Sequence, residues 1–155
     1  MKVRDLMSSP AVTVEATTPI AEVARTMLDR GLSGLPVVDE SGHMIGMITQ
    51  RDVVTKHAHP HVPLYLGILG GILPIDTRGM DAEVRQVLAV TARELMNENP
   101  KTIDADADVT DVADLMVDAV VNPVPVTSAS ELVGVISESD VMHLVLAEEA
   151  DGSPD

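Results

Sequence analysis

The feature that most constrains this chain is an internal repeat. The segment that begins at Val3 matches the segment that begins at Ala92 at a constant shift of 89 positions, which becomes 88 after one deleted turn residue. The matching positions are Leu6-Met7 with Leu95-Met96, Thr13 with Thr102, Val23-Ala24 with Val112-Ala113, Pro36-Val37 with Pro125-Val126, Gly46 with Gly134, Ile48 with Ile136, and Asp52-Val53 with Asp140-Val141. The repeat predicts two copies of one small structural unit.

Each copy has the pattern strand, helix, strand, strand, helix. In the first copy, Thr18 and Pro19 predict a helix cap and a first helical residue, and Gly31 predicts a left-handed helix end. The strands are expected at residues 12–14, 35–38 and 44–49, with a turn at 39–43 and a second helix from about Gln50. In the second copy, Asp108 and Asp111 open the corresponding helix. The apolar stripes of the two helices are Ile20, Val23, Ala24, Met27 and Leu28 in one copy, and Val109, Val112, Ala113, Met116 and Val120 in the other.

The two copies are expected to form one mixed α/β (α+β) fold. A unit of this size cannot bury both faces of its sheet alone, so the copies should pack face to face with pseudo-twofold symmetry. Equivalent loops would then face each other across a cleft, which is a natural place for a ligand.

Two segments carry a resemblance to a known family. They are Gly-Leu-Ser-Gly-Leu-Pro-Val-Val at 31–38 and Gly-Met-Ile-Thr-Gln-Arg-Asp-Val at 46–53, beside the Leu-Met opening and the Thr-Val strand. Each copy resembles a CBS motif, and the pair resembles the Bateman module found attached to kinases, channels and inosine monophosphate dehydrogenase. The resemblance implies a regulatory homodimer that binds an adenosine-containing ligand, such as AMP, ADP, ATP or S-adenosylmethionine, in the cleft between the motifs.

The resemblance also implies the ligand-binding residues. A Thr/Ser-x-x-Asp turn would hold the ribose and its phosphate, because a carboxylate accepts from both vicinal hydroxyls and the next helix offers free amides. The alternative is that these acids are only helix caps favoured by the helix dipole, and that the apolar pairs are only core. The residues are Thr49 and Asp52, Ser137 and Asp140 for the ribose, and Leu35-Pro36 or Val124-Pro125 with backbone near Thr13 and Thr102 for the adenine.

The two candidate sites differ in charge and in loop sequence. Arg51 lies within the first turn and can reach a phosphate, whereas its counterpart is Ser139. Residues 120–123 read Val-Val-Asn-Pro where the first copy has Gly-Leu-Ser-Gly, so the second loop should be stiffer. We therefore expect a charged nucleotide at the first copy. If only one site binds a ligand, the site at the second copy is the one expected to be missing.

Residues 57–91 have no counterpart in the repeat. The stretch at 62–75 is too apolar to be left in water, so it should pack over the helices of the module or complete a dimer, with a lid or a docking surface as the alternative. An amphipathic helix is expected from Met80 through Leu95 into the second copy. His57, His59 and His61 are weak candidates for a metal site, since alternate residues of an extended chain point the same way and imidazole binds zinc, nickel or copper. No metal site is predicted, because no cysteine and no nearby carboxylate completes the ligand set.

Composition excludes several functions. The formal charge is −15 and thirteen carboxylates follow Lys101, so nucleic acid and anionic membranes should be repelled. The chain has no cysteine, no signal-like start and no apolar run of membrane-spanning length, which favours a cytoplasmic location. No nucleophile with an adjacent base and no phosphate-binding glycine loop is found, so we expect no catalysis and no catalytic cofactor. A ligand-free scaffold that dimerises or recruits a partner through its apolar insert is the alternative function.

The sequence divides into four predicted parts. They are a first motif at 1–56, the insert with its connecting helix at 57–91, a second motif at 92–147, and an acidic disordered tail at 148–155.

Overall fold

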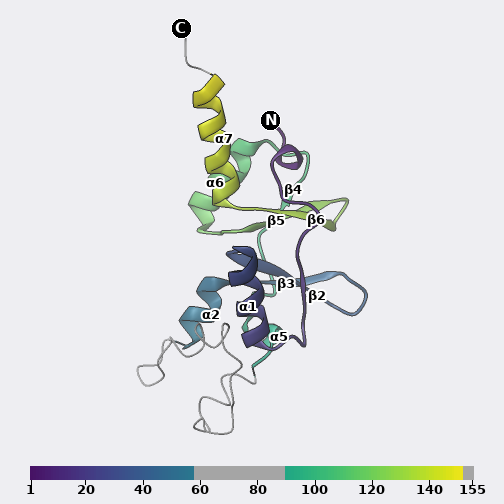
Figure 1. Ribbon diagram of the computed structural model, residues 1–155. Coiled ribbons are helices and arrows are strands. Elements are labelled where there is room, and N and C mark those ends of the chain that lie inside the picture. The colour runs from purple at the N-terminus through teal and green to yellow at the C-terminus, as the bar shows by residue number, and fades with distance from the viewer. Residues whose placement is uncertain (58–89, 152–155) are drawn as a thin grey trace. The chain divides into compact units, whose positions relative to one another are not determined.

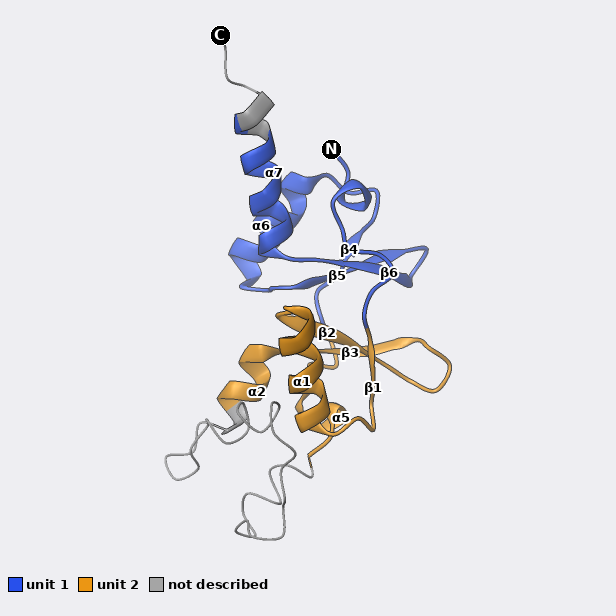
Figure 2. Ribbon diagram, in the orientation of Figure 1, with its two compact units in different colours: residues 1–12, 100–155 blue, residues 13–99 orange. Residues whose placement is uncertain are grey.

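The computed structural model describes residues 1–57 and 90–151, which fall into two compact units. Unit 1 comprises Met1–Val12 and Pro100–Asp155, and unit 2 comprises Thr13–Asn99 (Figure 2). The described elements (Figure 1) are η1 (Val3–Asp5), β1 (Val14–Glu15), α1 (Ile20–Arg30), β2 (Gly34–Val38), β3 (Met44–Thr49), α2 (Gln50–His57), α5 (Ala92–Leu95), β4 (Ile103–Asp104), α6 (Val109–Ala119), β5 (Val124–Ser128), β6 (Glu131–Ile136) and α7 (Glu138–Asp151).

Each unit contains one three-stranded sheet of the same topology. The sheet of unit 2 has the order β1-β2-β3 and that of unit 1 has the order β4-β5-β6. In both sheets the first pair of strands is parallel and the second pair is antiparallel, with one register shift in the antiparallel pair. The mixed α+β fold and the repeated order of strands and helices are therefore confirmed.

Helix α1 ends where the sequence predicts and begins one residue later. Gly31 has φ 63° and closes the helix in the left-handed conformation. At the start, Pro19 is the extended cap residue, whereas Thr18 was expected there. The reason is that Thr18 is held outside the helix: its amide donates to the Glu15 carbonyl, and its own carbonyl accepts from the Ala92 amide at 2.9 Å.

Helix α6 confirms its predicted start but ends earlier than its apolar stripe. Asp108 and Asp111 form a capping box at the N-terminus. Val120, expected as the last apolar position of the stripe, instead lies after the helix with φ 52° and is 72% exposed. The second copy thus makes the same left-handed turn as the first copy, but with a β-branched residue in place of glycine.

Apolar residues of the strands and of one helix face build each core. In unit 2 the sequence-predicted stripe positions Ile20, Val23 and Met27 are buried. In unit 1 the equivalent positions Val109, Val112 and Met116 are buried. The unit 1 core also contains Val3, Ile103, Ala105, Val124, Val126 and Ile136.

The first residues of each copy pack in the unit that contains the rest of the other copy. Ser8 and Val135 exchange backbone hydrogen bonds of 2.9 and 3.0 Å in unit 1, and Asn97 and Met47 do the same at 3.0 and 2.8 Å in unit 2. Residues 1–12 therefore belong with the second copy, and residues 92–99 with the first, in contrast to the contiguous boundaries expected from the sequence (Figure 2).

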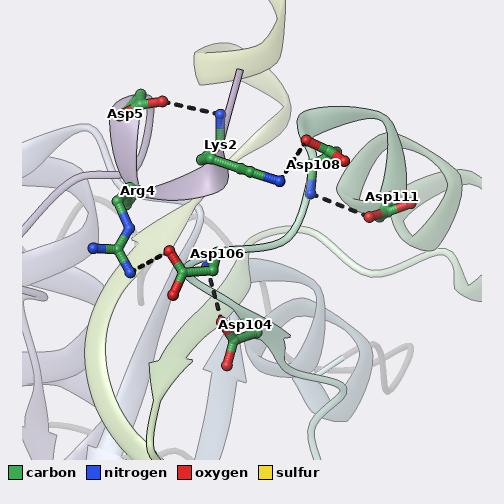
Figure 3. Close-up of polar contacts among 7 residues, drawn as sticks. All are labelled: Lys2, Arg4, Asp5, Asp104, Asp106, Asp108 and Asp111. Carbon is green, nitrogen blue, oxygen red and sulfur yellow. Dashed lines mark hydrogen bonds and ion pairs between the residues drawn. The ribbon is translucent and has the colours of Figure 1, made fainter.

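Ion pairs fasten the N-terminal segment in unit 1 (Figure 3). Lys2 Nζ lies 2.9 Å from Asp108 Oδ1, and the Arg4 guanidinium pairs with Asp106. The hydrogen bond between Lys2 and Asp108 raises the pKa of the lysine and lowers the pKa of the carboxyl. Because all four side chains are substantially exposed, these pairs orient the segment more than they stabilise it.

Two predicted features at the ends of the second motif are wrong. Thr91 is extended, with φ −100° and ψ 165°, and the Val90 carbonyl accepts from the Ile20 amide, so no continuous helix enters α5. Helix α7 runs to Asp151, so residues 148–151 are helical where disorder was expected. The apolar stretch at 62–75 lies outside the described residues, as do residues 152–155.

The described part of the chain contains no helix that is both long and apolar enough to cross a lipid bilayer.

Replacing Val120 by glycine should stabilise the protein by about 1 kcal/mol, because a β-branched residue in the left-handed region costs more than the added chain entropy of glycine. The measurement is the free energy of unfolding in urea. Gly31→Val is the matched change in the other copy and should destabilise by a similar amount. Loss of stability in Val120→Gly would contradict this account of the turn.

Gly46→Ala and Gly134→Ala should each destabilise the protein by about 1–3 kcal/mol through overpacking. An added Cβ at Gly46 would lie 2.9 Å from the Asn97 carbonyl oxygen, and one at Gly134 would lie 2.7 Å from the Ser8 carbonyl oxygen. Both oxygens belong to the backbone of the segments that pack from the other copy, so neither can move aside as a flexible side chain could. Thermal unfolding checks the effect, and wild-type stability in either variant would show that the segments do not pack this closely.

Candidate functional site

The predicted Thr-x-x-Asp turn of the first copy is a hydrogen-bonded box at the start of α2. Asp52 Oδ2 accepts from the Thr49 amide at 2.8 Å and from the Thr49 hydroxyl at 2.9 Å. The Asp52 amide in turn donates to Thr49 Oγ1 at 3.2 Å. Thr49 is the last residue of β3, so the strand delivers the hydroxyl directly to the first turn of the helix.

The predicted Ser-x-x-Asp turn of the second copy has the same geometry at the start of α7. Asp140 Oδ2 accepts from the Ser137 amide and from the Ser137 hydroxyl, both at 2.7 Å. The Asp140 amide donates to Ser137 Oγ at 3.4 Å. The second copy therefore repeats both the residue types of the first box and its hydrogen bonds.

These boxes are helix caps, as the alternative interpretation expected. In both boxes every hydrogen bond to the carboxylate uses Oδ2, and the described residues provide no donor to Oδ1 of Asp52 or Asp140. Both acids are only partly buried. Each carboxylate thus keeps one oxygen with lone pairs available to an outside donor.

The loop before each helix satisfies the first helical amide in a different way. In unit 2 the Gln50 amide donates to the Ser33 carbonyl at 2.9 Å. In unit 1 the Glu138 amide donates to the side-chain oxygen of Asn122 at 3.1 Å. Sequence analysis had not assigned a role to Asn122, although its place opposite Ser33 in the aligned loops was the available signal.

Unit 2 brings its remaining predicted residues to the end of the sheet that carries the box. Thr13 directly precedes β1, and Leu35 and Pro36 lie near the start of β2, where Gly34 pairs with Thr49. Leu35 and Pro36 are buried, whereas Thr13 is exposed. Contact of an adenine with these residues stays a prediction.

Unit 1 repeats this arrangement with its own residues. Thr102 directly precedes β4, and Val124 and Pro125 begin β5, where Val124 pairs with Ile136 beside Ser137. Val124 and Pro125 are buried, and Thr102 is exposed. Each unit therefore contains a complete set of the predicted side chains, and the cleft shared by the two copies stays a prediction.

The charge difference between the two boxes is also visible. Arg51 is the second residue of α2 and is exposed, and Ser139 occupies the equivalent position in α7. A guanidinium near the first turn of α2 adds positive charge beside a helix N-terminus. The box of α7 has Glu138 in its first turn instead.

No group of three or more potential metal ligands occurs among residues 1–57 and 90–151. His59 and His61 lie outside the described residues, so the weak metal candidates His57, His59 and His61 stay untested.

A hollow that sequence analysis had not identified lies at the opposite end of the unit 2 sheet. It has a volume of about 420 Å³ and is lined by Glu15, Ala16, Thr17, Val38, Asp39, Glu40, Ser41 and Arg93. In unit 1 the residues equivalent to Arg93 and Thr17 are Arg4 and Asp106, which form an ion pair. Because Thr17 replaces the aspartate, Arg93 lacks the equivalent ion pair. Three carboxylates nevertheless line the same hollow.

The model of the family described as CBS domain matches residues 3–59 and 92–147. The two matches coincide with the two copies of the repeat and cover most of the chain.

Among curated proteins, the chain is similar to the uncharacterized protein MK0525 of Methanopyrus kandleri, at 41% identity over 51 residues, or 33% of this chain and 26% of that protein. It is also similar to hypoxic response protein 1 of Mycobacterium tuberculosis, at 26% identity over 138 residues, which cover 89% of this chain and 80% of that protein. The chain spans only about a quarter to a third of the first two curated relatives that it matches.

Among solved structures, the CBS domain pair of protein MJ0100 in complex with 5'-methylthioadenosine and S-adenosyl-L-methionine matches at 25% identity, with a TM-score of 0.70 and coverage of 96% of this chain and 98% of that chain. A structure of hypoxic response protein 1 with two coordinated zinc ions matches at 25% identity, with a TM-score of 0.65 and coverage of 92% and 98%.

Asn122→Ala should destabilise the protein by about 1 kcal/mol, because it removes the acceptor of the first α7 amide. Ser33→Ala is the matched control, since the equivalent acceptor there is a backbone carbonyl that the change leaves in place. The free energies of unfolding of both variants check the difference. Equal stability of the two variants would contradict a capping role for Asn122.

Proposed function

The chain belongs to the CBS domain family, and from this premise we propose that it is a non-catalytic regulatory module whose two boxes bind adenosine-containing ligands. The ligand classes are adenine nucleotides and S-adenosylmethionine or its relatives. Binding would shift an equilibrium between conformations of the module.

The observation that carries the proposal is the free oxygen of each boxed carboxylate. Oδ2 of Asp52 and of Asp140 is used by the cap, and Oδ1 remains an acceptor for a ribose hydroxyl. The threonine or serine hydroxyl, which both donates and accepts within the box, fixes the orientation of that carboxylate. A cap of this kind is a preorganised sugar-binding group.

The related CBS pair of MJ0100 supports the ligand class. At 25% identity and nearly full coverage, that protein is described in complex with two ligands that share a 5'-thioadenosine group. The part common to both ligands is the adenine and its ribose, which is the part that the boxes of this chain suit.

Charge favours different ligands at the two boxes. Arg51 beside the α2 box suits a phosphate, so a nucleotide is proposed there. Glu138 lies in the first turn of α7, so that box suits an uncharged or cationic adenosyl compound.

Asp52→Asn should keep the helix cap and lower the affinity for the ligand. The asparagine oxygen can still accept from the Thr49 amide, but the carboxylate charge and its second acceptor oxygen are lost. In a thermal-shift titration with AMP, ADP, ATP, 5'-methylthioadenosine and S-adenosylmethionine, the wild type should be stabilised in proportion to the logarithm of ligand concentration. Asp52→Asn and Asp140→Asn should each reduce the shift for the ligand of their own box.

The matched control is Asp111→Asn. Asp111 caps α6 through the same type of bond, a 3.1 Å contact of its Oδ2 with the Asp108 amide, but lies at neither box. Its thermal shifts should equal those of the wild type. The absence of any shift with all five compounds, or an equal loss in Asp111→Asn, would refute ligand binding at the boxes.

A homodimer is the second part of the proposal, and exposed apolar side chains favour it. Val117 on α6 is 76% exposed, and Met142 and Leu146 on α7 are 66% and 62% exposed. Large apolar side chains gathered on one pair of helices are typical of a surface that is covered by another chain. A ligand-free scaffold that dimerises or recruits a partner through its apolar insert is the alternative function, and the titration above separates it from a sensor.

A further inference from the structure

Unit 2 has an apolar groove between helices α1 and α2, with a volume of about 170 Å³. Leu28 of α1 and Val54 of α2 line it and are 50% and 42% exposed. Large apolar side chains exposed around a groove are typical of a surface that another segment or molecule covers. The groove is lined by Ala24, Met27, Leu28, Gln50, Val53 and Val54, none of which is charged.

Helices α1 and α2 run antiparallel along this groove. Gln50 is the first residue of α2, and its side-chain amide donates to the Leu32 carbonyl at 3.1 Å, just after the end of α1. The later residues of α2 therefore lie beside the earlier residues of α1, and Figure 2 shows the two helices side by side in unit 2.

The segment 58–89, which lies outside the described residues, begins and ends within about one helical turn of the groove. Helix α2 ends at His57, three residues after Val54, which is about 4.5 Å along the helix. On the other side, the Val90 carbonyl accepts from the Ile20 amide at 2.9 Å, and Ile20 lies one turn before Ala24. The groove is thus the apolar surface beside both ends of this segment.

The sequence of the segment suits the groove in reach and in composition. Four residues, 58–61, separate His57 from Val62 and can span about 13 Å. The stretch 62–75 then contains eight valine, leucine or isoleucine residues and no charged residue. Packing of such a stretch against an uncharged groove removes apolar surface from water on both sides.

The second copy is less suited to the same occupant. Glu138 of α7 corresponds to Gln50, so a carboxylate replaces the neutral amide that lines the groove of unit 2. A stretch without charged side chains has no cation to pair with that carboxylate, and burial of an unpaired charge is costly. The charge difference between the copies therefore favours the α1–α2 groove.

From these observations we propose that the stretch 62–75 packs into the α1–α2 groove of its own chain and covers Leu28 and Val54. This proposal assigns the apolar insert to its own unit 2, rather than to another copy or to a partner protein. It goes beyond the proposed function and does not depend on it, since no ligand takes part in the contact.

The first test is photocrosslinking from the groove, which is possible because the chain has no cysteine. Leu28→Cys protein labelled with benzophenone maleimide should crosslink on irradiation to peptides from residues 62–75. Val54→Cys, labelled in the same way, gives a second position in case the label at Leu28 displaces the stretch. Val117→Cys is the matched control on α6 and should give no such crosslink.

Mixing of ¹⁵N-labelled and unlabelled protein before irradiation distinguishes contacts within one chain from contacts between chains. The proposal predicts that both peptides of each crosslink carry the same isotope. Mixed-isotope crosslinks would mean that a second copy covers the groove, and would overturn the proposal. Absence of crosslinks to 62–75 from both Leu28→Cys and Val54→Cys would also overturn it.

The second test is a mutant cycle on the folding equilibrium. Leu28→Asp should lower the equilibrium constant for folding about tenfold or more if the groove is covered, because the new carboxylate would lose its water. Leu66→Ser combined with Leu69→Ser should also lower it. All three changes together should cost much less than the product of the two separate losses, since the residues share one contact.

Two outcomes of the cycle would contradict the contact. One is a change of less than about twofold in Leu28→Asp, which is typical of an open surface. The other is a combined loss equal to the product of the separate losses. Either result would leave ligand binding at the boxes standing, because the thermal-shift titration of Asp52→Asn tests that function separately.

Discussion

Both units depend on one kind of contact, in which the first residues of one copy pack closely against a strand of the other copy. Asn97 runs beside Met47 and Ser8 beside Val135, and each approach is possible because the residue before the contacted strand position is a glycine, Gly46 or Gly134. These segments pair with β3 and β6, the edge strands of the two sheets, and each of these strands ends at a candidate box. Helix α2 starts directly after β3, and α7 starts one residue after β6, so the position of each box follows from the strand before it.

In the proposed function, the boxes combine a structural role and a ligand-binding role in the same few atoms. One oxygen of each carboxylate satisfies the cap, and this fixes the other oxygen at the end of a strand beside a helix N-terminus. A cap would need only one such oxygen. The repetition of the hydroxyl and the carboxylate at both helix starts, together with the family to which the chain belongs, supports the proposal of a sugar ligand.

Local features of the fold could be predicted from the sequence, but pairings between distant segments could not. Gly31 and the box at Thr49 and Asp52 are set by neighbouring residues, so short patterns identify them. Repeat alignment cannot reveal in which unit a flanking segment packs, because that depends on contacts such as Ser8 with Val135, which are far apart in the chain. Likewise, the helical stripe did not reveal that the chain turns at Val120, since valine gives no signal for a left-handed turn.

Amide chemical shifts provide the most direct measurement of the central claim, that the two boxes bind an adenosine group. In a ¹⁵N-labelled sample titrated with 5'-methylthioadenosine and then with AMP, the amides of residues 49–52 and 137–140 should shift and saturate. The amides of the α6 cap, Asp108 and Asp111, should stay in place. Saturable shifts confined to other parts of the chain, or no shifts at ligand concentrations well above those in cells, would contradict the account.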